Sequence, residues 1–167
     1  MDIQKLIDDY TSWLKNEITF EKIGEYYEIT TPYLDNANDY LQIYVKQEGN
    51  DIFFTDDSIT MHNLKMSGFQ LTQNRKLQLQ RILYQYGVQL KGDELIAKAP
   101  LNNFAHKKHM FIQAMLRIDD MFVVSKSRVS SFFLDDIQEF FLEKEIYYTD
   151  NVQFMGLSGF SHNYDFL

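Results

Sequence analysis

The sequence predicts an α+β fold: an N-terminal helix, a small antiparallel sheet, a helical layer, and then a helix with a terminal β-hairpin. Three observations predict it. Apolar residues recur every three or four positions near the N-terminus. Segments rich in β-branched and aromatic residues follow, and beyond them come long stretches with helical periodicity. Each pattern matches the repeat of the element it predicts.

Residues 2–18 are predicted to form the first helix. Asp2 is placed to cap its N-terminus, because an Asp side chain accepts hydrogen bonds from the free backbone N–H groups there. The apolar residues that share one face of this helix are Ile3, Leu6, Ile7, Tyr10, Leu14 and Ile18. The helix is therefore amphipathic.

The sheet is predicted from segments 26–32, 40–46 and 52–55. The second segment alternates with a period of two, which sets Leu41, Ile43 and Val45 on one face. Short connections join the three segments, so we expect an antiparallel meander. A small hairpin, 88–90 with 95–97, is predicted further along the chain.

The helical layer is predicted from periodic segments that begin after capping residues. They are 59–66 after Asp56-Asp57-Ser58, then 72–86, a helix from Asn102 or Asn103 to about 123, and one from Ser130 or Ser131 to about 144. Residues expected to point inward from the third are Phe104, Phe111, Met115, Ile118 and Phe122, and from the fourth Leu134, Ile137, Phe140 and Phe141. Two closing strands, 147–154 and 160–167, follow.

Two units are expected along the chain. Ser125-Lys-Ser-Arg-Val-Ser-Ser131 is polar and typical of a loop. We therefore place an α+β domain at residues 1–125, and a helix and hairpin at 126–167 that open a second, truncated domain.

Composition restricts the classes of function. The 167 residues carry a net charge of −8 and contain no cysteine, so disulfides and thiolate chemistry are excluded. The acidic balance disfavours nonspecific binding to nucleic-acid phosphates. The N-terminus lacks an apolar signal core and no run is long enough to span a bilayer. We expect a soluble, cytoplasmic protein with no membrane contact.

Patterns of standard catalytic sites are absent from the sequence. The seven glycines are scattered without P-loop or dinucleotide-binding spacing. Asp56-Asp57 directly follows a strand, where carboxylates can bind Mg²⁺, but two Asp residues there also suit a turn and a helix cap. We favour the turn and cap, and we expect no cofactor and no metal.

Acidic doublets and tyrosines are the candidate partner contacts. Carboxylates spread over a surface can engage a basic channel on a target, and exposed Tyr side chains can anchor an interface. The candidates are Asp8, Asp9, Asp56, Asp57, Asp119, Asp120, Asp135, Asp136, Tyr26, Tyr27, Tyr40 and Tyr44. Ordinary solvated helix faces are the alternative explanation of the doublets.

Four stretches, taken in order, resemble a known family. They are Ile29–Asp35, Asn38–Lys46, Thr55-Asp-Asp57 with Asn63–Gly68, and Lys107-Lys-His109 with Gln113–Leu116. The set resembles a bacterial and phage family in which domain of unknown function 1828 is followed by domain of unknown function 1829. Residues 20–120 resemble the first domain, and 129–167 resemble only the start of the second.

The resemblance implies a protein of mobile elements and prophages, involved in conflict between phage and bacterium. One departure concerns the residue after Thr-Asp-Asp, which is usually Gly in the family and is Ser58 here. We expect Ser58 to act as a helix cap instead of adopting the positive φ that Gly favours.

The functional hypothesis is a non-enzymatic interaction protein that binds and inhibits or modulates a host defence or nucleic-acid-handling protein, with anti-CRISPR action as its concrete form. One alternative is the remnant of a metal-dependent nuclease that uses Asp39, Asp56, Asp57 or Asp165. Another is a regulator that binds DNA through Arg75, Lys76 and Arg81. A homodimer formed by pairing of the terminal strand with a second copy is also considered.

Overall fold

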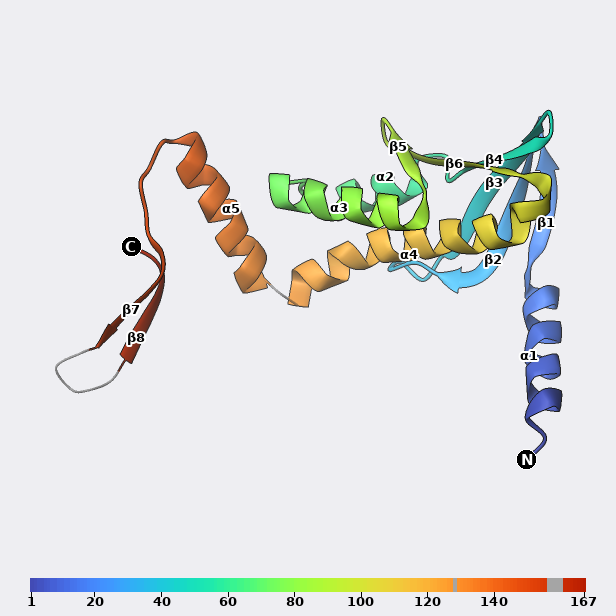
Figure 1. Cartoon of the computed structure of the whole chain (residues 1–167), viewed down its shortest axis with the longest axis horizontal. Coiled ribbons are helices and arrows are strands. Elements are labelled where there is room, and N and C mark those ends of the chain that lie inside the picture. The colour runs from blue at the N-terminus through green and yellow to red at the C-terminus, as the bar shows by residue number, and fades with distance from the viewer. Residues whose placement is uncertain (128, 156–160) are drawn as a thin grey trace.

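The computed structural model describes the backbone of residues 1–127, 129–155 and 161–167, and the side chains of 1–121, 133–155 and 161–167. It is a mixed α+β structure (Figure 1). Its centre is a six-stranded antiparallel sheet with the order β1-β2-β3-β4-β6-β5. The strands are β1 (Thr19–Ile23), β2 (Tyr26–Leu34), β3 (Tyr40–Glu48), β4 (Asp51–Thr55), β5 (Gln89–Lys91) and β6 (Glu94–Pro100).

Helices precede, cover and follow this sheet. They are α1 (Ile3–Glu17), α2 (Ile59–Met66), α3 (Gln73–Tyr86), η1 (Leu101–Asn103), α4 (Phe104–Ser127) and α5 (Val129–Glu143). A separate two-stranded sheet of β7 (Asp150–Met155) and β8 (Ser161–Phe166) closes the chain.

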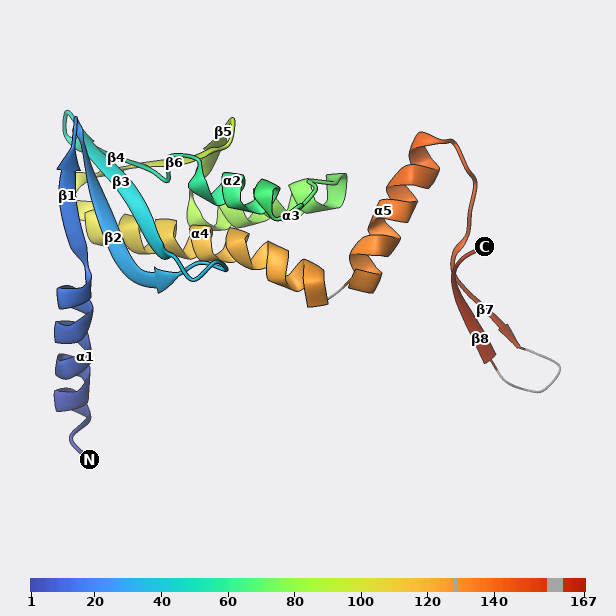
Figure 2. The ribbon, with the colours of Figure 1, turned by 180° about the vertical axis from the view of Figure 1, so that it is seen from behind.

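The helical layer lies on one face of the six-stranded sheet. In β3 the burial alternates along the strand, with Leu41, Ile43 and Val45 buried. These side chains pack with Phe54 and Leu95 against α2, α3 and α4, whose buried residues include Phe111, Met115 and Ile118. Figure 1 shows α4 in front of the strands, and Figure 2 shows the strands from the side that no helix covers. The core is therefore one-sided.

A buried carboxylate joins β4, α2 and β6. Asp56 is 0% exposed. Its Oδ1 accepts hydrogen bonds from the N–H groups of Ser58 at 3.0 Å and Leu95 at 2.8 Å, and its Oδ2 accepts one from Thr60 at 3.0 Å. Burial raises the pKa of Asp56, while hydrogen bonds to its carboxylate oppose that shift. Asp56 thus satisfies backbone donors at the start of α2 and fixes that start beside β6.

The expectation for Ser58 was wrong. Ser58 has a φ of 69°, and its side chain makes no capping hydrogen bond. The preceding residue, Asp57, also has a positive φ of 52°. Because the Asp56 side chain already accepts from the Ser58 and Thr60 N–H groups, the serine hydroxyl is not needed as a cap. The turn instead uses the left-handed conformation that Gly adopts without strain.

The C-terminal elements have a small aromatic cluster of their own. Phe141 of α5 lies 5.2 Å from Tyr148 and 5.5 Å from Phe166, measured between ring centroids. Leu134, Ile137 and Phe141 are half-buried, but Phe140 is 50% exposed, which corrects the expectation that it points inward. α5 also contacts the main body through an ion pair, with Arg75 Nη1 3.8 Å from Asp136 Oδ1.

Most predicted elements are confirmed, with two differences in the sheet. β1 was not predicted, although it pairs along its whole length with β2, from Thr19↔Thr30 to Ile23↔Tyr26. The small hairpin is also part of the main sheet, because β6 pairs with β4 from Asp51↔Pro100 to Thr55↔Ile96. The predicted boundary at residue 125 falls within α4, which continues to Ser127. The side chain of Phe122 and residues 156–160 lie outside the described residues.

Replacing Asp56 by Asn tests the buried carboxylate. We expect Asp56→Asn to lower the free energy of unfolding by about 2–3 kcal/mol, because the Asn amide turns an N–H group towards one of the three buried donors. Asp57→Asn is the control, since Asp57 is exposed, and it should change stability by less than about 0.5 kcal/mol. Urea denaturation measures both, and equal stabilities of the two variants would contradict the role of Asp56.

Replacing Ser58 by Gly tests the strained turn. Left-handed backbone costs a non-Gly residue about 1–2 kcal/mol, which exceeds the entropy that Gly loses on folding. We expect Ser58→Gly to raise the free energy of unfolding by about 0.5–1 kcal/mol. Ser67→Gly is the control because Ser67 has an ordinary φ of −75°, so it should lower stability. Thermal unfolding that shows destabilisation by both changes would refute the prediction.

Candidate interaction surface on the open sheet face

The uncovered side of the six-stranded sheet presents one set of alternating side chains. The cross-strand pairs Glu28↔Tyr44, Lys46↔Phe53 and Phe53↔Lys98 fix which residues share this side. We call it the open face, and define it by Glu21, Tyr26, Glu28, Gln42, Tyr44, Lys46, Glu48, Asp51, Phe53, Lys91, Glu94 and Lys98. Several of them are half-buried by one another, so the surface is polar but closely packed.

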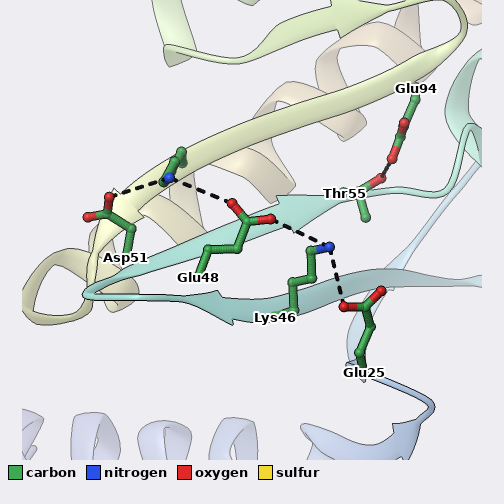
Figure 3. A network of polar contacts seen from close by, with 7 residues as sticks. Glu25, Lys46, Glu48, Asp51, Thr55 and Glu94 are labelled. Carbon is green, nitrogen blue, oxygen red and sulfur yellow. Dashed lines mark hydrogen bonds and ion pairs between the residues drawn. The ribbon is translucent and has the colours of Figure 1, made fainter.

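Lys46 lies at the centre of the open face (Figure 3). Its Nζ is 3.6 Å from Glu25 Oε2 and 3.5 Å from Glu48 Oε1. The same ammonium group lies 4.8 Å from the centroid of the Tyr26 ring and 5.6 Å from that of Phe53. The contact with Tyr26 is the largest cause that raises the pKa of Lys46, and Glu25 and Glu48 add to it. Lys46 therefore remains a cation that holds two carboxylates and two rings in place.

The charge network continues across β4 to β6. Lys98 Nζ lies 3.6 Å from Glu48 Oε2 and 3.6 Å from Asp51 Oδ2. Further along the same side, the Thr55 hydroxyl donates a hydrogen bond of 2.5 Å to Glu94 Oε1 (Figure 3). The open face carries five carboxylates against three lysines, so it is acidic as a whole.

Tyr44 and Gln42 fix a further carboxylate on β2. The Tyr44 hydroxyl donates a 2.9 Å hydrogen bond to Glu28 Oε2, and Gln42 Nε2 donates one of 2.9 Å to Glu28 Oε1. Burial raises the pKa of Tyr44 to about 12, and the bond to Glu28 and the charge of Glu28 add to the shift. Both oxygens of Glu28 are thus held in one orientation on the surface.

A second group of acidic residues lies at one end of the sheet, beside the loop between β2 and β3. A cleft of about 390 Å³ there is lined by residues that include Asp35, Asp39, Tyr40 and Asp119. Two of these carboxylates are used inside the protein. Asp119 Oδ2 accepts from the Asn36 N–H at 2.8 Å, and Asp35 Oδ1 accepts from the N–H groups of Ala37 and Asp39. These carboxylates therefore shape the loop.

The predicted acidic doublets do not share one surface. Asp8 and Asp9 lie on exposed α1, and Asp57 and Asp120 are exposed. Asp56 is 0% exposed, so its carboxylate cannot contact a partner without local rearrangement. Asp119 is 9% exposed and lines the cleft at the end of the sheet. On α5, Asp135 lines a cleft beside the N-terminus of α3, and Asp136 pairs with Arg75.

The four predicted tyrosines lie in three different parts of the structure. Tyr26 and Tyr44 lie on the open face. Tyr40 lines the cleft at the end of the sheet. Tyr27 points to the opposite side of β2, where its ring contacts Phe20 at 6.4 Å between centroids. The sequence analysis missed Glu28, Lys46, Glu48 and Phe53. The two-residue alternation of β2 and β3 was the signal that could have joined the first two to Tyr26 and Tyr44.

The basic residues proposed for DNA binding do not form an exposed set. Arg75 is 7% exposed, and its guanidinium donates a 2.8 Å hydrogen bond to the Gln70 carbonyl and lies 4.8 Å from the centroid of the Phe69 ring. Lys76 and Arg81 are exposed on the same helix. Arg75 therefore anchors the start of α3 instead of facing solvent.

Within the described residues, the ionisable groups do not gather as a metal site would require. No group of three or more His, Asp or Glu residues there is arranged to hold a metal ion. Asp39 and Asp57 are exposed on different segments, and Asp165 lies in β8 of the separate hairpin. Among the same residues, no helix has the length and apolar character needed to cross a membrane.

The profile of domain of unknown function 1828 (DUF1828) matches residues 31–118, which is more than half of the chain. The chain belongs to the DUF1828 family. The matched DUF1828 segment runs from within β2 to within α4, so it contains β3, β4, β5, β6, α2 and α3. α1, β1, α5 and the terminal hairpin lie outside it. Comparisons with curated proteins and with solved structures give no significant match.

The pKa of Tyr44 gives a stability effect at high pH. Between pH 10 and about 12 an unfolded chain releases the Tyr44 proton while the folded protein keeps it. The free energy of unfolding therefore falls as the pH rises through that window. The stability that protonated Tyr44 contributes is fully present below pH 10. We expect the stability difference between the protein and Tyr44→Phe to shrink across it.

Urea denaturation at several pH values from about 9 upward measures this difference. Glu28→Gln is the companion variant, because it removes the charge that opposes formation of tyrosinate and should move the Tyr44 pKa down. A stability difference between protein and Tyr44→Phe that stays constant from pH 10 to 12 would contradict the assignment.

Proposed function

We propose that this DUF1828 protein is a non-enzymatic interaction protein whose open face binds a basic surface of another protein. The observation that supports this most is the fixed acidic and aromatic arrangement around Lys46. Surface ion pairs contribute little to stability, with about 0–1 kcal/mol for each pair. A network of this extent on a protein surface is better explained by the fixed orientation that it gives to the side chains of Glu25, Glu48, Tyr26 and Phe53.

The charge and shape of the open face determine the kind of partner. An acidic surface attracts a basic one, and complementary potentials increase the rate of association and the selectivity. Rings of Tyr and Phe held in one orientation supply contact area at low entropic cost. The partner that fits is therefore a protein with Lys and Arg side chains around an apolar centre.

We further propose that the target is a host defence or nucleic-acid-handling protein. Such proteins bind phosphate backbones with basic channels, which are surfaces of the complementary charge. Inhibition of a CRISPR effector is the concrete form of this proposal. Its motivation is the family resemblance together with the net charge of −8.

A charge-reversed protein tests the open face. We expect Glu21→Lys combined with Glu48→Lys to abolish capture of a basic partner from a bacterial lysate, because both changes put positive charge on that face. The matched control is Asp120→Lys combined with Glu143→Lys, which changes the net charge equally at exposed residues of α4 and α5. Mass spectrometry identifies the captured proteins, and circular dichroism checks that both variants fold.

The control must retain what the open-face variant loses. Equal loss in both variants would mean that total charge, and not the open face, determines binding. Capture that is unchanged in the open-face variant would refute the proposed function. Purified partner, titrated at two salt concentrations, then gives the electrostatic contribution, since screening weakens exposed charge pairs.

A further inference from the structure

α1 presents an apolar stripe that the rest of the chain leaves uncovered. α1 has no buried residue. The stripe consists of Ile3, Leu6, Ile7, Tyr10 and Trp13, which are between 49% and 58% exposed. In both views α1 extends away from the sheet, and it contacts β2 (Figures 1 and 2).

A helix of this kind depends on packing for its stability. α1 has 15 residues, and isolated helices of that length are marginal in water. Its N-terminus is capped, since Asp2 accepts a hydrogen bond from the Lys5 N–H at 3.2 Å. The rings of Tyr10 and Trp13 stack at 6.1 Å between centroids, which keeps two large apolar groups together on the stripe. Covering the stripe would remove these groups from water.

The charges of α1 are divided between its two sides. Asp2 and Asp9 are seven residues apart, so they lie on the same flank, directly beside the stripe. Glu17 lies at a stripe position near the C-terminal end of the helix. Lys5, Lys15 and Asp8 lie on the side away from the stripe, because each is well over 90° from the centre of the stripe when successive residues are placed about 100° apart. Whatever covers the stripe therefore meets negative charge at its edge.

The charges disfavour a second copy of the chain as the cover. In an antiparallel pair of α1 helices, the Asp2 and Asp9 flank faces the same flank of the other copy, and like charges oppose each other. In a parallel pair it faces the flank of Gln4 and Thr11, where Lys15 lies about 20° beyond Gln4, so the facing flanks do not oppose this arrangement. Each copy also carries a net charge of −8.

We propose that α1 docks its stripe into an apolar groove of another protein, and that basic side chains line the rim of the groove beside Asp2 and Asp9. An amphipathic helix in an apolar groove is a common mode of recognition. The docking of α1 does not rest on the open face, because the stripe and that face belong to different elements.

Trp13 reports directly on the stripe, since it is the only tryptophan of the chain. The probe is a helical peptide of Leu and Lys residues, which presents an apolar surface with a basic rim, and a Leu and Glu peptide of the same pattern is its control. Added to the full chain, the Leu/Lys peptide should move Trp13 emission to shorter wavelength in a saturable way. The Leu/Glu peptide should not.

Variants separate charge complementarity from apolar contact. Asp9→Lys should weaken binding of the Leu/Lys peptide about tenfold, because it places like charges at the rim. Lys5→Glu should leave the titration unchanged, since Lys5 lies away from the stripe. Leu6→Asp should abolish the shift. Circular dichroism of each variant checks that the helix content is retained.

Three results would overturn the docking of α1 on a basic-rimmed groove. The first is an equal response to both peptides, or none. The second is an emission shift that follows the concentration of the chain alone, with a dimer in sedimentation, which would assign the stripe to a second copy. The third is a shift with phosphatidylcholine and phosphatidylglycerol vesicles but not with the Leu/Lys peptide, which would assign it to a lipid surface.

Discussion

The buried carboxylate of Asp56 is the constraint on which the rest of the fold depends. Hydrogen bonds from Ser58, Thr60 and Leu95 attach the end of β4 to the start of α2 and to β6. β6 is thereby held next to β4, and α2 turns onto the side of the sheet where Phe54 and Leu95 are buried. With α2, α3 and α4 packed on that side, the opposite side remains uncovered. The open face is therefore uncovered because all three helices pack on the other side of the sheet.

An uncovered sheet side must still satisfy its own polar groups and rings. On the open face this is done laterally, by Lys46 between Glu25 and Glu48 and by Tyr44 against Glu28. Each pair contributes little free energy at a surface, but together they restrict the side chains before any partner arrives. A restricted surface loses less entropy on binding than a mobile one. The same network thus keeps an exposed sheet ordered, and this order is what the proposed contact would use.

The sequence predicts those elements whose own residues determine them. The periodicity of α4 predicts that Phe111, Met115 and Ile118 are buried, as the structure confirms. β1 escaped prediction because Thr19–Ile23 is exposed throughout and becomes a strand only by pairing with β2. Ser58 was misread because its conformation is decided by the Asp56 side chain. The open face was missed for a related reason: it is assembled by the register of neighbouring strands, which spacing within one segment does not give.

The order of elements separates the open face from α1. Most of the open face, including Gln42, Tyr44, Lys46, Phe53 and Lys98, falls within the DUF1828 segment, whereas α1 precedes it. β1, which carries Glu21 of the open face, follows α1 directly and pairs with β2 from Thr19↔Thr30 to Ile23↔Tyr26. If both proposed surfaces bind the same partner, so short a connection makes them linked sites, where the first contact raises the effective concentration of the second. A weak groove for α1 and a weak basic patch for the open face would then combine into a tight complex. For that reason the affinity of either surface measured alone underestimates that of the whole chain whenever both meet the same partner.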